Sequence, residues 1–177
     1  MDSYELDFSR LKDFSKEFSG GSVLLRMLSG IGFRYYWTTH QLKHKDLQFK
    51  YHQVSWTVED ILVHIFHLVC SVQCVLEEKV FDKSQMIAPK EFEELRKKTL
   101  ERIRFSCLEI SKKSDSEIQN LKVRVVVNQK VRCYSMYHLI NGHLSDALHH
   151  LGQIAILRRM SGNPMDSGVN YFLGTKV

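Results

Sequence analysis

The chain has 177 residues, of which 44% are hydrophobic and 25% charged. This composition is that of a folded globular protein and excludes an intrinsically disordered chain. The formal net charge is +5, but the basic residues are scattered and alternate with acidic ones, so we expect no specific binding to nucleic acid. The length suits a single domain over residues 1–177.

The composition also bears on the compartment. The N-terminal stretch is acidic and amphipathic, unlike a secretory signal, and no long uncharged apolar run predicts a transmembrane helix. We therefore expect a cytoplasmic protein with no membrane partner. The cysteines form no CxxC pair and are expected to be buried, reduced thiols; they are Cys70, Cys74, Cys107 and Cys133.

Helical periodicity dominates the sequence, and only two prolines interrupt it, so an all-α domain is predicted. Apolar residues at helical spacing predict a first helix from about Tyr4 to Phe18. Gly20-Gly21 are expected to end this helix, as glycines commonly do. A second helix is predicted from about Ser22 to Leu42, and a polar connection follows it.

Two further helices occupy the middle of the chain. Thr57 is predicted to cap the first of them, with Glu59 and Asp60 in the first turn, where the helix dipole favours acidic side chains. Its apolar stripe continues to about Val75. After a loop, a charged helix is predicted from about Lys90 to Lys113.

The last third of the chain combines a hairpin with a long helix. Alternating apolar and polar residues around Asn128-Gln129 predict a short β-hairpin. A final helix is predicted from about Met136 to Met160, because Asn163-Pro164 prevent its continuation. The predicted parts are a helical extension over 1–20, a helical body over 22–164 and a tail over 165–177.

The final helix carries a pair of side chains with the spacing of metal ligands. Asp146 precedes His150 by four residues, which places both on one helix face, one turn apart. The same face is apolar and is expected to point inwards, where a carboxylate needs a neutralising partner. His64, on the buried face of the third helix, is the candidate third ligand, and His67 is the reserve. Two imidazoles and one carboxylate suit Zn²⁺, Fe²⁺, Ni²⁺ or Mn²⁺.

The same residues also allow an interpretation without a metal. Asp146 and His150 could form a hydrogen bond or ion pair along one helix, and His64 could be a hydrogen-bonded core histidine. His143 lies roughly 10 Å along the helix axis from His150, too far to share an ion with it. It could instead support Asp146 or line the cavity.

Two stretches resemble the DinB/YfiT-like superfamily of metal-binding proteins. WTVEDILVHI is similar to the pattern that opens the second bundle helix of that family, with matches at Trp56, Glu59 and His64. DALHHLGQI is similar to its His-x-x-x-His-x-Gly-Gln ending: His150 and the following Gly-Gln match, while Asp146 stands in place of the first histidine. The resemblance extends from about residue 22 to residue 164.

The resemblance implies an up-down-down-up four-helix bundle, here with an extra N-terminal helix and a short hairpin before the last helix. It implies a divalent metal in the bundle cavity, held by His64, Asp146 and His150, with Zn²⁺ or Ni²⁺ expected first and Fe²⁺ or Mn²⁺ next because a carboxylate makes the site harder. It further implies a homodimer. The expected function is a metal-dependent hydrolase or thiol-dependent transferase, with second-shell candidates His67, His143 and Gln153.

An alternative function keeps the fold without the chemistry. In it the domain is a non-catalytic small-molecule-binding or stress-response bundle with a degenerate metal site. The aromatic residues of GFRYYW (32–37) and Tyr171-Phe172 in the tail would then cover an apolar cavity, although such residues more often belong to a plain core. The sequence identifies no substrate for either function.

Overall fold

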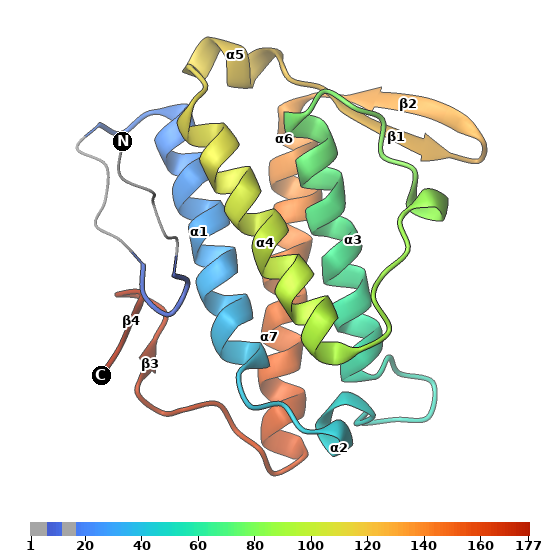
Figure 1. The fold of residues 1–177 in the computed structure, drawn as a ribbon, viewed down its shortest axis with the longest axis vertical. Helices are drawn as coiled ribbons and strands as arrows, with labels where there is room; N and C mark the ends of the chain where they lie inside the picture. The colour runs from blue at the N-terminus through green and yellow to red at the C-terminus, as the bar shows by residue number, and fades with distance from the viewer. Residues whose placement is uncertain (1–6, 12–16) are drawn as a thin grey trace.

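The computed structural model describes residues 7–11 and 17–177, and the chain is mostly helical (Figure 1). Four long helices lie side by side: α1 (Gly20–Thr39), α3 (Val58–Leu76), α4 (Phe92–Ser111) and α7 (Ser145–Met160). Helices α1 and α7 run in one direction and α3 and α4 in the other (Figure 1). Both α1 and α3 pack against α4 and against α7, so the four helices enclose one shared core.

Short elements lie between the long helices along the chain or follow α7. They are α2 (His44–Leu47), the 3₁₀ turn η1 (Lys83–Gln85), α5 (Asp115–Asn120), β1 (Val123–Val127), β2 (Lys130–Tyr134), α6 (Met136–His138), the π-helical segment η2 (Leu139–Leu144), β3 (Val169–Asn170) and β4 (Thr175–Lys176). Strands β1 and β2 form one antiparallel hairpin, and β3 and β4 form a second one in the tail. The predicted polar connection before α3 therefore contains one short helix.

Aliphatic side chains from all four long helices fill the core. Ile31, Ile65, Ile103 and Ile154 are each at most 1% exposed. Among the described residues, α3 is the helix that is long and apolar enough to cross a membrane by length and composition alone, with 61% of its apolar window buried inside the protein. The core helix of a soluble protein has the same properties, and the burial of α3 is consistent with that role.

The beginning of α1 differs from the prediction. Residues 7–11 form a turn and a bend, so the predicted helix from Tyr4 to Phe18 is wrong there. Residues 4–6 and 12–16 of this predicted helix lie outside the described residues. Gly20 and Gly21 begin a helix and do not end one. Their N–H groups donate to the Asp115 carboxylate at 3.0 and 2.8 Å. A Cβ on Gly21 would lie 3.0 Å from that carboxylate, so the glycine permits the close approach.

The predicted final helix is present but is interrupted. The π-helical segment η2 lies between α6 and α7, and such a segment inserts extra residues into a turn and so changes which side chains face inwards. Ile140, an apolar residue of the predicted helix, is 39% exposed. At the other end, Gly162 adopts a φ of +79°, and the N–H of Asn163 donates to the Arg158 carbonyl at 2.9 Å. This is a Schellman ending, so the predicted stop after Met160 is confirmed.

The hairpin of β1 and β2 follows the sequence pattern, and the tail packs on the helices. Asn128 and Gln129 have φ values of 50° and 60°, as a type I′ turn between β1 and β2 requires. In the tail, Tyr171 packs edge-on against Phe33 with ring centroids 6.2 Å apart. Phe33, Tyr35 and Trp37 of the GFRYYW segment are at most 7% exposed, so they are core residues.

Three of the four cysteines are buried free thiols, as expected, but Cys133 on β2 is exposed. Burial raises the pKa of Cys70 and of Cys107 to about 11, which makes both thiols unreactive at neutral pH. Cys133 lies on a two-stranded hairpin whose β2 strand is exposed throughout, so no core covers it.

Candidate metal centre

The start of α3 fixes the position of His64. Thr57 is the N-cap: its hydroxyl accepts the Asp60 N–H at 3.1 Å, and the Asp60 carboxylate accepts the Thr57 N–H at 2.9 Å. This capping box satisfies two backbone donors at once and sets the direction in which the chain enters the helix. His64 follows two turns later on the side of α3 that faces α7. The predicted cap and first turn are confirmed.

Asp146 and His150 lie on the first two turns of α7, directly after the π-helical segment. The Asp146 side chain is 41% exposed and that of His150 is 10% exposed. His150 is therefore held by packing, while Asp146 lies at the surface edge of the site. The His64 side chain is 25% exposed, so the three residues form a half-buried group that solvent reaches from one side.

The three predicted ligands meet in space. His64 Nε2 lies 3.0 Å from Asp146 Oδ2, and His150 Nε2 lies 3.3 Å from Asp146 Oδ1. One potential ligand atom from each residue lies within 4.8 Å of the other two. Ligand atoms around a tetrahedral ion with bonds of 2.0–2.2 Å are about 3.3–3.6 Å apart. The three side chains are close enough to this spacing that His64, Asp146 and His150 could hold a metal ion.

Gln153 determines which nitrogen of His150 is available. The Nδ1–H of His150 donates to Gln153 Oε1 at 2.7 Å, so Nε2 is the nitrogen directed at Asp146. The Gln153 amide then donates to His149 Nε2 at 3.0 Å. With an ion bound, His150 is a neutral imidazole whose Nε2 lone pair is free to ligate it. Without an ion, His150 Nε2 faces Asp146 Oδ1 at 3.3 Å.

Trp56 forms a wall of the site. Its ring stacks on His150 with centroids 5.7 Å apart and an interplanar angle of 21°. The same ring lies 5.2 Å from the His64 ring. Trp56 is 51% exposed, although large aromatic side chains are usually buried. The sequence marked Trp56 only as part of a pattern, and its contact with both histidines depends on the packing of α3 against α7.

His67 and His143 lie outside the group of three. The His67 ring donates from Nε2 to the Met86 carbonyl at 2.9 Å. This hydrogen bond joins α3 to the loop before α4. His143 contacts the Ser71 hydroxyl through Nε2 at 2.9 Å. Burial lowers the pKa of both histidines below the ordinary value of 6.5. His143 was expected to be too far from His150 to share an ion, and the structure agrees.

The three residues that we expected to support the ligands therefore have two different roles. Gln153 touches a proposed ligand directly, whereas His67 and His143 are bonded to other parts of α3 and its loop. His149 is exposed and accepts the hydrogen bond from the Gln153 amide. A glutamine three residues after a candidate ligand was the available sequence signal for this contact.

Comparison of the chain with known protein families, with curated proteins and with solved structures finds no match. The function is therefore inferred from the geometry of the three side chains and from the residues around them.

Proposed function

We propose that this chain is a cytoplasmic, DinB-like four-helix bundle that binds one divalent metal ion through His64, Asp146 and His150. The observation that carries the proposal is the convergence of two imidazole Nε2 atoms on one carboxylate at 3.0 and 3.3 Å. The directions of α1, α3, α4 and α7 (Figure 1) support the up-down-down-up arrangement that the sequence resemblance implies.

The proposed ligand set leaves room for a further ligand. Three protein ligands and an open position are the arrangement of catalytic metal sites, in which the ion polarises a substrate or lowers the pKa of a bound water or thiol. The residues of this chain perform the remaining tasks. Gln153 orients His150, Trp56 shields one side, and the exposed edge at Asp146 gives access from solvent.

The reaction class proposed for this site is hydrolysis or the transfer of a thiol to an electrophile. Both need a nucleophile that is deprotonated near neutral pH, which a metal with an open position supplies. The set of two nitrogens and one carboxylate oxygen suits Zn²⁺ or Ni²⁺, and the carboxylate brings Fe²⁺ and Mn²⁺ within range.

The test is the metal content of the untagged protein, measured by inductively coupled plasma mass spectrometry. We expect near-stoichiometric metal in the parent protein, and its loss in His64→Ala, Asp146→Ala and His150→Ala while the circular dichroism spectrum keeps its helical form. His138→Ala, at an exposed histidine bonded to Ser135, is the matched control and should retain the metal. Failure of the parent to hold any ion after reconstitution with Zn²⁺, Ni²⁺, Fe²⁺ and Mn²⁺ would overturn the proposal.

A further inference from the structure

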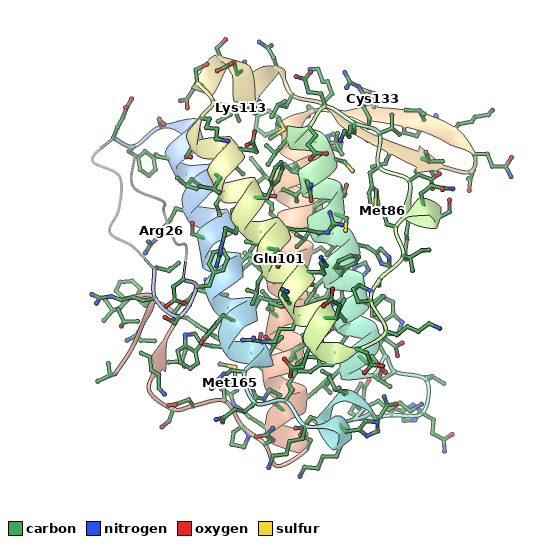
Figure 2. All side chains as sticks on the ribbon, in the orientation of Figure 1. Arg26, Met86, Glu101, Lys113, Cys133 and Met165 are labelled. Atoms are coloured by element: carbon green, nitrogen blue, oxygen red, sulfur yellow. The ribbon has the colours of Figure 1, made fainter. Side chains whose placement is uncertain are left out.

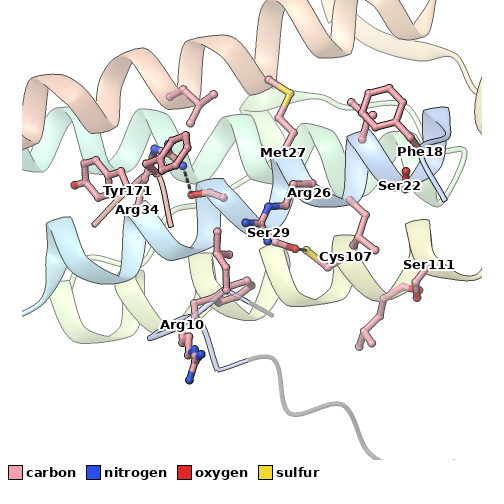
Figure 3. A pocket seen from close by; sticks show the side chains of 18 of the residues that line it. Arg10, Phe18, Ser22, Arg26, Met27, Ser29, Arg34, Cys107, Ser111 and Tyr171 are labelled. Carbon is pink, nitrogen blue, oxygen red and sulfur yellow. Dashed lines mark hydrogen bonds between the residues drawn. The ribbon is translucent and has the colours of Figure 1, made fainter. Parts of the chain in front are cut away.

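A second concave site lies along α1, on residues other than the metal ligands. It is a groove of about 890 Å³ formed by α1, α4, Leu148 of α7, the described N-terminal residues and the tail. Figure 3 shows Tyr171 and Arg34 at one end and Phe18 and Ser22 at the other. Pockets that bind small molecules have volumes of roughly 300–1,000 Å³, so the groove is large enough for one.

The walls of the groove are mainly apolar. Leu25, Met27 and Leu148 line it and are partly buried against the core. Three phenylalanines also line it, and two of them present almost their whole surface to solvent: Phe18 is 93% exposed and Phe172 is 90% exposed. Exposed apolar surface gathered around a groove is typical of a ligand-binding site.

The charges in the groove are arranged unequally. At the Tyr171 end, Arg34 lies over the tyrosine ring at 5.0 Å and donates from Nη1 to the Gly30 carbonyl at 3.1 Å. A guanidinium has five N–H donors, and in the described part of the chain no carboxylate forms an ion pair with Arg34. Arg10 and Arg26 also line the groove, together with the acidic side chain of Glu17. With three arginines and one carboxylate in its lining, the groove favours an anionic ligand, and Arg34 offers that ligand a guanidinium at the Tyr171 end.

We propose that this groove binds a fatty acid, with the carboxylate on Arg34 and the hydrocarbon chain lying along α1 towards Phe18. The distance fits an alkyl chain, because the twelve residues from Ser22 to Arg34 cover about 18 Å of helix. A planar guanidinium pairs well with a carboxylate through two parallel hydrogen bonds. The chain would cover the two exposed phenylalanine rings and remove their surface from water.

Isothermal titration calorimetry with decanoate, and with decan-1-ol as the neutral probe of the same length, tests this assignment on the full chain. Decanoate should bind once per chain, and more tightly than decan-1-ol. Arg34→Gln should weaken decanoate binding about tenfold, as expected for one charge-assisted contact, and leave decan-1-ol binding unchanged. Phe172→Ser should weaken both, since Phe172 is on the surface and the fold does not depend on it. Arg132→Gln, on exposed strand β2, is the control and should change neither.

Three results would overturn the proposal. The first is no saturable binding of decanoate by a parent protein with an intact helical spectrum. The second is decanoate binding that survives Arg34→Gln but disappears in His150→Ala, which would place the carboxylate on the metal centre. The third is a dimer in light scattering that Phe172→Ser dissociates, together with no decanoate binding, which would show that a second copy of the chain covers the groove.

Discussion

Two aspartates, Asp46 beside the end of α7 and Asp146 at its start, both contact polar groups. They differ in how completely hydrogen bonds satisfy the carboxylate. Asp46, on α2, is 0% exposed. It accepts hydrogen bonds from the Ser161 hydroxyl at 2.7 Å, the Asn163 amide at 2.6 Å and the Lys43 N–H at 2.9 Å. Asp146 is 41% exposed, and the polar side chains that it contacts in the described part of the chain are the imidazoles of His64 and His150.

The group around Asp46 is complete without any added ligand. Burial by itself would raise the pKa of Asp46, but the hydrogen bonds from Ser161, Asn163 and Lys43 outweigh burial, and the pKa is lowered. Arg158 beside it donates to the carbonyls of Trp37, Thr38 and Asn163. No buried side-chain nitrogen or oxygen of this group lacks a hydrogen-bond partner among the described residues, as a buried polar network needs in order to stabilise a fold.

The group around Asp146 is arranged differently. One carboxylate faces two Nε2 atoms, and the Nδ1–H of His150 is already bonded to Gln153. Both Nε2 atoms, of His64 and of His150, face the same carboxylate, at 3.0 and 3.3 Å. Polar side chains in the core of a helical protein are therefore not enough to identify a functional site. The useful sign is a set of acceptors that face one another across a distance that an ion would bridge.

The largest expected difference between the two aspartates is in stability. Asp46→Asn places an amide N–H₂ among hydrogen-bond donors in a buried site, and we expect it to lower the free energy of unfolding by about 2–4 kcal/mol. Asp146→Asn in metal-free protein should lower it by less than about 1 kcal/mol, because that side chain is partly solvated. Urea denaturation with a chelator present measures both values. Equal losses at the two positions would show that Asp146 is as structural as Asp46.

A smaller effect is expected at Gln153, which supports a proposed ligand without touching the ion. Gln153→Leu removes the acceptor for the His150 Nδ1–H and should weaken metal binding about 10–100-fold, as is usual for such partners. Gln153→Glu restores an acceptor and should recover most of the affinity. Competition with a chromophoric chelator measures the three affinities. Identical affinities in all three proteins would mean that Gln153 has no part in orienting the ligand.

The local features of the fold were predictable because they follow from short-range chemistry. The Thr57 cap, the Asn128-Gln129 turn and the stop after Met160 each depend on residues within one or two turns of each other. The start of α1 carried one such local signal, because the Ser19 hydroxyl accepts the N–H of Ser22 and caps the helix. The glycine pair hid this signal, since glycines are more typical of a helix end, and the bonds from Gly20 and Gly21 to Asp115 join residues that are far apart in sequence.

The candidate site was predictable in its ligands but not in its surroundings. The four-residue spacing of Asp146 and His150 is a property of one helix, and the buried side of α3 pointed to His64. The stacking of Trp56 on His150 depends on how two helices pack, which no local pattern encodes. The π-helical segment also escaped prediction because the apolar periodicity of an interrupted helix differs from that of an intact one only by a small change of phase.

The smallest expected effect is the change of stability with pH that comes from three partly buried histidines outside the metal group. Burial lowers the folded-state pKa of His40, His67 and His143 below the ordinary value of 6.5, which the unfolded chain retains. As the pH falls through that value, the unfolded chain takes up protons that the folded chain does not. Metal-free protein should therefore be most stable above about pH 6.5 and lose stability on acidification, with a slope of at most about 1.4 kcal/mol per pH unit for each histidine.

His143→Gln isolates one contribution to this slope. Glutamine is expected to keep a hydrogen bond to Ser71 but does not titrate, so the dependence of the unfolding free energy on pH between 7.5 and 5.5 should be shallower than in the parent protein. The window lies above the range in which Asp46 and other carboxylates with lowered pKa values take up protons, so histidines dominate it. A slope that is unchanged by His143→Gln, and unchanged by His67→Gln, would show that neither ring is held neutral by the fold.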